Sequence, residues 1–461
     1  MSWPAILIAM LPEHLLLGGI VALLALEIAN ERCPGAFALA LVATAAAAIA
    51  AFCLHVTGYA AAPFPGHYAV APSASLAKFL LLAFAVPVLL LSRDEFSQSR
   101  YFALLLSSLY GACLLVSSAS FLTLFLGLEI MSLPVYALVL IAFQRPDSAE
   151  AALKYLVLGG TATATFLLGT SFLYGACGTL GIDAFARALG TADPLAATGA
   201  ALIVAALFLK AAVVPLHAWA PDAYEAASVP VTAYMAVIVK AGVLLAALQL
   251  FGSAPVPPAA AALIALLPLA SMLWGNIAAI RQASFRRMIA YSSIAHAGYL
   301  YFAFLGAGPG RYQTIMFYLA AYGVMTLLAF TALPGAGDDA AQDRLQSFEG
   351  LFHRRPYAAL AIAASMLSLA GLPPLPGFVA KFLVFRNVVA GGHTAWAVLG
   401  LLASYLGLYF YLRVIQLMFM QSPANQPQPT HARRLAWVAA VCCLLPAIAI
   451  AIAPGWLLDR L

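Results

Sequence analysis

The chain has 461 residues, of which 64% are hydrophobic and only 8% are charged, and its mean hydropathy is +0.98. A water-soluble domain of this size could not bury that much apolar surface, so the composition indicates an integral membrane protein in a lipid bilayer. The formal net charge of +5 is small and no basic cluster contains interleaved aromatic residues, which argues against nucleic acid as a partner.

Apolar runs of about 20 residues, separated by polar or Pro/Gly breaks, predict an all-α integral membrane fold with about 14 transmembrane helices. The expected limits in chain order are 8–29, 36–57, 74–91, 101–117, 119–143, 149–176, 197–219, 229–251, 259–280, 287–306, 311–333, 357–386, 394–420 and 434–457. The N-terminus has no positive charge before Arg32, so it is interpreted as a first membrane span and not as a signal peptide.

The arginines predict how these spans are oriented. If the limits are right, the odd-numbered loops share one side and carry twelve arginines: Arg32, Arg93, Arg100, Arg145, Arg281, Arg286, Arg287, Arg344, Arg354, Arg355, Arg433 and Arg434. The opposite side carries four, which are Arg187, Arg311, Arg386 and Arg460. By the positive-inside rule the first side is cytoplasmic. We therefore expect a multi-pass protein of a bacterial cytoplasmic (inner) membrane with both termini outside.

Two spans contain prolines that should interrupt their helices. Pro215 lies in the seventh span, and Pro373, Pro374 and Pro376 lie in the twelfth. Proline removes an amide donor and clashes with the preceding turn. Broken backbone at membrane depth is tolerated only where it is packed in protein or lines a wet cavity.

The two breaks are five spans apart, which is the spacing of an inverted repeat of five helices. Spans 4–8 would then match spans 9–13, because an odd number of spans turns the second copy upside down. This predicts an N-terminal three-helix segment at 1–100, a first repeat at 101–251, a second repeat at 259–420 and a C-terminal helix at 421–461.

Charged residues within the apolar spans are the candidate functional groups. A charge at the bilayer centre costs roughly 2.5–3.5 kcal/mol on insertion scales. Lys154, Lys210, Lys240 and Lys381, together with Glu129, therefore indicate an ion or proton pathway. Lys381 follows the second break and is the expected exit group, with snorkelling to the interface as the alternative.

Adjacent antiparallel spans could bring Glu129 and Lys154 within pairing range. Burial favours the neutral form of each partner while pairing favours the charged form, so such a pair is labile. The alternative is a static ion pair that locks two helices together. Lys210 and Lys240 have no acidic partner nearby in sequence, and an amine in apolar surroundings can exchange its proton near neutral pH.

His217 and His296 lie among apolar residues between these charges, and imidazole can bridge proton transfers. Each could equally be a hydrogen-bonded packing residue. We expect Lys78, which lies near a helix start, to be interfacial. The same expectation applies to the polar residues of the first span: Glu13, His14 and Glu27.

No cofactor or metal is expected on this chain. Its six cysteines have no CxxC or Cys/His ligand spacing and are interpreted as buried free thiols. The sequence also has no Walker A loop, no Rossmann fingerprint, and no His or Cys set suited to haem or iron–sulfur ligation. Any redox reaction must then occur on another chain.

Four segments resemble the antiporter-like subunits of proton-pumping NADH:quinone oxidoreductase (complex I). They are FLGLEIMSLPVYAL, FLKAAVVPLHAWAPDAYEAASVPVTAYMAVIVKAG, SMLWGNIAAIRQASFRRMIAYSSIAHAGYL and SLAGLPPLPGFVAKF. The resemblance runs from about Ala103 to Met420 and is greatest to the N-type subunit, whose mitochondrial counterpart is subunit 2. The family commonly has Gly-Ala-Pro where this chain has Ala226, Ala227 and Ser228.

The resemblance implies 14 helices, with helices 7 and 12 broken and a proton half-channel in each repeat. It implies that Glu129 pairs with Lys210 beside Lys154, that Lys240 and His296 continue a central axis, and that Lys381 ends it. His217 matches a family histidine after the first break.

The expected partners are other complex I membrane subunits, including neighbouring antiporter-like subunits. NADH, FMN, iron–sulfur clusters and quinone would be bound by other subunits. A subunit of a multisubunit cation/proton antiporter or of a membrane-bound hydrogenase remains an alternative, as does a non-conducting membrane scaffold.

Overall fold

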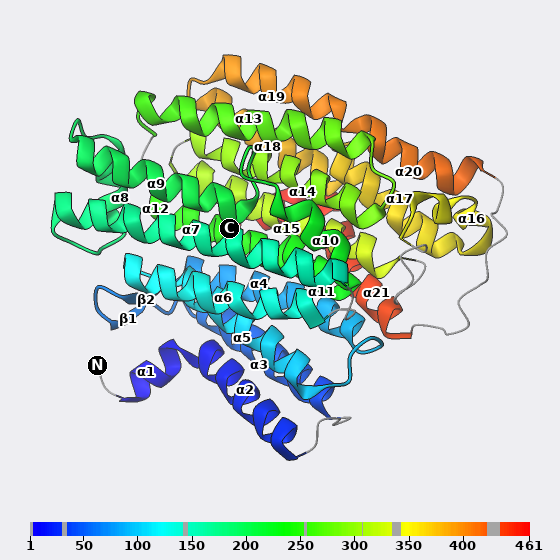
Figure 1. Ribbon diagram of the computed structural model, residues 1–461, viewed down its shortest axis with the longest axis horizontal. Coiled ribbons are helices and arrows are strands. Elements are labelled where there is room, and N and C mark those ends of the chain that lie inside the picture. The colour runs from blue at the N-terminus through cyan, green and yellow to red at the C-terminus, as the bar shows by residue number, and fades with distance from the viewer. Residues whose placement is uncertain are drawn as a thin grey trace. The chain divides into compact units, whose positions relative to one another are not determined.

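The computed structural model describes residues 3–29, 35–141, 146–252, 256–306, 308–333, 343–421 and 434–461. Within these ranges the chain is almost entirely helical, with one short β-hairpin (Figure 1). Thirteen of the described helices are long and apolar enough to cross a membrane. The all-α membrane fold is confirmed, while the exact number of spans and the inverted repeats remain predictions. Arg32, Cys33, Arg145 and Arg433 lie outside the described residues.

The chain divides into two compact units. The first comprises Met1–Lys210 and Ile238–Gly252, and the second comprises Ala211–Val237 and Ser253–Leu461. The first unit therefore contains the predicted N-terminal three-helix segment and most of the predicted first repeat.

Most helices of the first unit follow the expected spans. The helices are α1 (Trp3–Ala9), α2 (Leu11–Ala29), α3 (Ala36–Val56), α4 (Pro72–Ser92), α5 (Ser99–Val116), α6 (Phe121–Ile141), α7 (Pro146–Cys177), α8 (Asp183–Leu189), α9 (Pro194–Ala211) and α12 (Lys240–Phe251). Helix α9 ends at Ala211 and not at residue 219, and α1 and α8 were not predicted as separate helices. Helices α5 and α6 approach very closely, because a Cβ on Gly111 would lie only 2.3 Å from the backbone nitrogen of Met131. Only glycine fits at that crossing.

The hairpin of the first unit was not predicted. Strands β1 (Ala61–Phe64) and β2 (Tyr68–Val70) pair antiparallel, with Phe64 opposite Tyr68, and the hairpin lies beside α1 (Figure 1). It also rests on the turn between α5 and α6, where the Ala69 amide donates to the Ser117 carbonyl at 2.9 Å. This contact satisfies backbone groups that would otherwise be exposed at a strand edge.

The second unit contains the remaining elements. They are α10 (Trp219–Ala226), α11 (Val229–Tyr234), α13 (Pro258–Ile280), α14 (Phe285–Phe302), η2 (Ala303–Leu305), α15 (Pro309–Thr331), η3 (Leu345–Phe348), α16 (Leu351–Arg354), α17 (Pro356–Ala370), α18 (Pro376–Ala390), α19 (Thr394–Leu406), α20 (Leu408–Met420), α21 (Arg434–Ile452) and α22 (Pro454–Leu458). The π-helix η1 (Met235–Val239) contains the division between the units.

Both predicted helix breaks are present. Helix α9 ends at Ala211, and Ala212 has a left-handed φ of 60°, a conformation that ends a helix. Pro215 therefore lies in a connecting segment before α10, several residues beyond the end of the helix. The second break separates α17 from α18, with Pro373 and Pro374 between them. Pro376 is the first residue of α18, a position where its missing amide costs no hydrogen bond.

Candidate functional site

The first unit contains a buried ion pair between Glu129 of α6 and Lys210 of α9. The Lys210 Nζ lies 3.0 Å from Glu129 Oε1, and the side chains are 6% and 19% exposed for Lys210 and Glu129. Nζ also donates to the Ser132 hydroxyl at 3.3 Å. Thr163 of α7 donates a short hydrogen bond to the same carboxylate oxygen. The carboxylate therefore accepts from two neighbouring helices, α7 and α9.

The geometry follows from local structure. Ser132 is three residues after Glu129 on α6, so both side chains face the same neighbour. Lys210 occupies the last turn of α9, two residues before the left-handed residue Ala212. This arrangement matches the Glu129–Lys210 pair that the resemblance implied.

Lys154 forms an ion pair of 2.7 Å with Glu150, four residues earlier on α7, and both side chains are largely exposed (45% and 67%). An acidic residue four positions before a lysine on a helix is a favourable local partner. The pairing of Glu129 with Lys154 stays a prediction.

Lys240 is buried, with only 5% of its surface exposed. It begins α12 directly after the π-helix η1. Single π-helical turns are rare and occur frequently at functional sites. Because Lys240 is buried, its ammonium group lies among protein side chains and not at the surface of the unit.

In the second unit, Lys381 of α18 points back to the break that precedes it. Its Nζ donates to the Ala370 carbonyl at 2.9 Å and to the Ser404 hydroxyl at 3.2 Å. Ala370 ends α17, so the lysine satisfies a carbonyl that the helix end leaves without an intrahelical donor. The break in the twelfth span therefore creates the acceptor for the lysine.

His296 lies close to Lys381 through Tyr299. The Lys381 Nζ is 4.9 Å from the centre of the Tyr299 ring, and that ring is 5.7 Å from the imidazole of His296. The two ring nitrogens of His296 contact the hydroxyls of Tyr318 (2.8 Å) and Tyr411 (3.2 Å). A continuous set of groups that accept and donate protons thus surrounds the histidine.

His217 differs from His296 because it is only half-buried. Its Nε2 accepts a hydrogen bond of 3.0 Å from the indole of Trp274, so Nδ1 carries the proton and donates to the Pro215 carbonyl at 3.2 Å. The histidine side chain therefore stabilises the connecting segment beside the first break, through one contact within the segment and one with α13.

The start of α14 carries a charged cluster that the sequence did not predict as a site. Arg286 pairs with Asp343 at 3.1 Å. Arg287 pairs with Asp222 at 2.8 Å and with Glu225 at 2.9 Å. Burial raises the pKa of Asp343, and the Arg286 guanidinium opposes that shift. These pairs hold α10 and the segment at Asp343 against α14.

Sequence reasoning also missed a fully enclosed ion pair. Glu13 and Lys78, expected to be interfacial, are both 0% exposed, and Lys78 Nζ lies 2.6 Å from Glu13 Oε1. The sequence signal was weak because each residue is within two turns of the start of its helix, where charged side chains are common.

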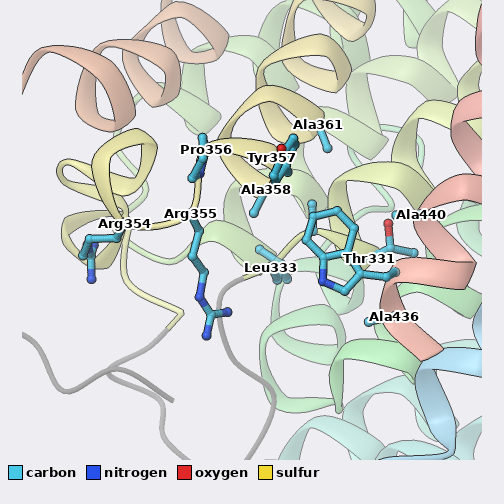
Figure 2. A pocket seen from close by; sticks show the side chains of 12 residues that line it. Thr331, Leu333, Arg354, Arg355, Pro356, Tyr357, Ala358, Ala361, Ala436 and Ala440 are labelled. Atoms are coloured by element: carbon cyan, nitrogen blue, oxygen red, sulfur yellow. The ribbon is translucent and has the colours of Figure 1, made fainter. Parts of the chain in front are cut away.

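The described residues contain no group of three or more His, Cys, Asp or Glu that could hold a metal ion. The five described cysteines are free thiols, but only Cys113 and Cys443 are buried, so the expectation of burial is wrong for Cys53, Cys177 and Cys442. A groove of about 350 Å³ opens beside α17 and α21, lined by Arg354, Tyr357 and Trp437 among others (Figure 2). None of the proton-pathway candidates lines it.

Broken apolar helices with charged groups buried between them define a multi-span membrane protein of the ion-translocating class. Residues 118–407 match the family described as NADH:quinone oxidoreductase/Mrp antiporter, TM. NADH-quinone oxidoreductase subunit N of Pelobacter propionicus is 39% identical over 435 residues, which cover 94% of this chain and 93% of that protein. The chain belongs to the NADH:quinone oxidoreductase/Mrp antiporter family, within its NADH-quinone oxidoreductase subunit N group.

Solved structures share the fold. A chain of respiratory complex I from Thermus thermophilus with bound aureothin is 33% identical, with a TM-score of 0.84 over 97% of this chain and 98% of that one. A chain of the Mrp complex from Dietzia sp. is 21% identical, with a TM-score of 0.84 over 98% of this chain and 96% of that one. The second likeness concerns the fold alone.

Proposed function

We propose that this chain is a membrane-arm subunit of an NADH:quinone oxidoreductase that carries protons across the membrane and carries no electrons. The observation that carries the proposal is the buried Glu129–Lys210 pair, which lies directly before a helix break. Buried ionisable groups inside membrane spans are expensive and typically mark proton or ion pathways. The names of the relatives supply the driving reaction, and NADH, FMN, iron–sulfur clusters and quinone would be bound by other subunits.

In the proposed mechanism, a charge change in a neighbouring subunit alters the separation of Glu129 and Lys210. Their attraction is strong in a low-dielectric interior, so the proton affinity of Lys210 depends on that separation. Lys210 then passes its proton to Lys240, and the transfer continues through His296 to Lys381. Lys154 would supply protons from its exposed position. His217 would transfer protons in the connecting segment beside the first break.

We further propose that Lys381 releases the proton outside the cell. The side with twelve arginines would face the cytoplasm of a bacterial inner membrane, and both termini would lie outside. The partners would be other membrane subunits of the complex, including antiporter-like neighbours, and the surrounding lipid.

The test is NADH-driven proton uptake by inverted membrane vesicles from a Lys210→Ala strain, with the NADH:quinone rate and complex assembly measured in parallel. We expect proton uptake to fall about tenfold, because a positioned proton-transfer group contributes at least that much to its step. Proton uptake and electron transfer both at the wild-type level would mean that the lysine is structural, and the scaffold alternative would replace the proposal.

A subunit of a cation/proton antiporter or a membrane-bound hydrogenase is the second candidate, since the family includes Mrp antiporters. Purification of the complex distinguishes the two. Flavin and iron–sulfur subunits that oxidise NADH support the first function, and their absence from the purified complex supports the second.

A further inference from the structure

The enclosed ion pair in the first unit joins three elements. Glu13 lies on α2, Lys78 on α4, and Tyr68 on β2. Lys78 Nζ lies 2.6 Å from Glu13 Oε1 and donates to the Tyr68 hydroxyl at 2.8 Å, while that hydroxyl donates to Glu13 Oε1 at 2.7 Å. The two charged side chains are 0% exposed. Three protonatable groups therefore form a closed triangle with no direct access to solvent.

Only one of the two carboxylate oxygens of Glu13 accepts hydrogen bonds within the described part of the chain. Both contacts converge on Oε1, whereas Oε2 is buried and has no hydrogen-bond partner among the described residues. A buried oxygen without a donor is costly when the carboxylate is charged. Protonation of the carboxyl group lowers that cost, because a neutral carbonyl oxygen is less costly to bury than a charged one, so the geometry is suited to a group that exchanges a proton.

Other titratable groups lie near this carboxyl group. Tyr110 and Cys113 of α5 are within electrostatic range of Glu13. His14, the next residue on α2, has a buried Nε2 that lacks a hydrogen-bond partner within the described ranges. Lys78 is the positively charged partner of Glu13 in the ion pair.

The hairpin encloses the cluster and links it to the helix that carries Glu129. Tyr68 forms a β-bridge with Ser118, and the Ala119 amide donates to the His67 carbonyl at 2.8 Å. These residues form the turn that leads into α6. Helix α5 packs against α2 on one side and against α6 on the other, where Ser108 donates to the Met131 carbonyl at 2.6 Å. The cluster and the Glu129–Lys210 pair therefore share one rigid neighbour.

We propose that Glu13, Tyr68 and Lys78 form a second proton-exchange site in the first unit. In the exchange step, Lys78 gives a proton to the Tyr68 oxygen as Tyr68 gives its own proton to Glu13 Oε1. The N–H bond of the ammonium and the O–H bond of tyrosine break, and two O–H bonds form. The products are a neutral amine, an unchanged tyrosine and a neutral carboxylic acid. This inference depends on the proposed function, because it adds a site to the same proton-carrying subunit.

A static ion pair that fastens α2 to α4 is the competing explanation, and neutralising both partners separates the two. The Glu13→Gln/Lys78→Met double variant removes both charges and leaves no unpaired one, so the complex should assemble. Proton uptake per NADH oxidised, measured in inverted vesicles, should fall at least about twofold if the site lies on the pathway. Asp183→Asn/Arg187→Gln is the matched control, because that pair also has a 2.6 Å contact but is largely exposed.

Wild-type proton uptake in an assembled double variant would overturn the proposal and assign the pair a fastening role. If the double variant fails to assemble, Tyr68→Phe decides, since it removes only the bridging hydroxyl. Reduced uptake by Tyr68→Phe supports the exchange step, and normal uptake contradicts it. Lys210→Ala, assayed in the same vesicles, separates the two proposals. If Lys210→Ala loses proton uptake and the Glu13→Gln/Lys78→Met double variant keeps it, only the Glu13 site is rejected. If Lys210→Ala keeps normal proton uptake, the proposed function is rejected.

A spectroscopic readout tests the chemistry independently of transport. In the purified complex, the infrared difference spectrum recorded during NADH oxidation should contain a carboxyl band that is absent from Glu13→Gln. An identical difference spectrum in the wild-type complex and in Glu13→Gln would contradict proton exchange at Glu13.

Discussion

The first unit holds two Glu–Lys pairs that differ in how they are enclosed. Glu13 and Lys78 are fully buried and 2.6 Å apart, whereas Glu129 and Lys210 are 19% and 6% exposed and 3.0 Å apart. Each carboxylate receives its contacts on Oε1, from its lysine and a tyrosine hydroxyl at Glu13 and from its lysine and a threonine hydroxyl at Glu129. The other oxygen of Glu13 is buried without a hydrogen-bond partner among the described residues. Glutamate and lysine thus form a fully enclosed pair at Glu13 and Lys78, and a partly exposed pair beside a helix break at Glu129 and Lys210.

The two pairs should differ most in the stability that the complex loses when one partner is removed. Lys78→Met leaves the Glu13 carboxylate buried without a charge partner, which typically costs about 3–5 kcal/mol. We expect the midpoint of thermal disassembly of the purified complex to fall markedly. The loss should be reversed when Glu13→Gln is added. A double variant as unstable as Lys78→Met alone would show that the lysine stabilises the fold by packing and not by charge.

The corresponding change at the other pair should cost less. Lys210→Met leaves Glu129 with the Thr163 hydroxyl and with partial exposure, so the remaining charge is better solvated. We expect a loss of about 1.5–3 kcal/mol, the range for a lost hydrogen bond to a charged group. The same disassembly measurement checks this. A loss as large as that of Lys78→Met would mean that the two sites are equally closed.

The two pairs also show what could be predicted from the sequence. The sequence singles out Glu129 and Lys240 because a charge far from either end of an apolar span has few structural explanations, and it singles out Lys210 and Lys381 because each lies beside a predicted break. Glu13 and Lys78 could not be identified in this way, because a charge near a helix start is usually interfacial. Their burial depends on the hairpin, whose strands of four and three residues leave almost no periodic signal.

Lys154 shows a different limit. The sequence offers it a local partner, Glu150 four positions earlier, as well as the long-range partner Glu129, and spacing alone does not choose between them. The fold itself was more predictable than the site. Span limits follow from hydropathy, whereas the direction of a side chain depends on which neighbouring helices pack around it.

Lys381 extends the comparison to a lysine that is held by the carbonyl of Ala370. Gly371, which follows that carbonyl, has φ 89°, and a Cβ there would lie 2.8 Å from the Lys381 Cδ. Gly371→Ala should therefore combine backbone strain of about 1–2 kcal/mol with displacement of the lysine. Proton uptake should fall together with thermal stability.

Gly392→Ala is the control for strain alone, since Gly392 has φ 84° and open space around its Cβ position. We expect it to lower stability by a similar amount, about 1–2 kcal/mol, and to leave proton uptake unchanged. Equal loss of uptake in both variants would mean that strain, and not the position of Lys381, limits transport.

The smallest effect should come from the exposed pair on α8. Asp183 and Arg187 lie 2.6 Å apart, as close as Glu13 and Lys78, but their side chains are 68% and 60% exposed. Water and salt screen such a pair, so its contribution is about 0–1 kcal/mol. Asp183→Asn should leave the disassembly midpoint within error, with or without added salt. A shift comparable to that of Lys78→Met would contradict the view that enclosure, and not distance, makes the Glu13–Lys78 pair exceptional.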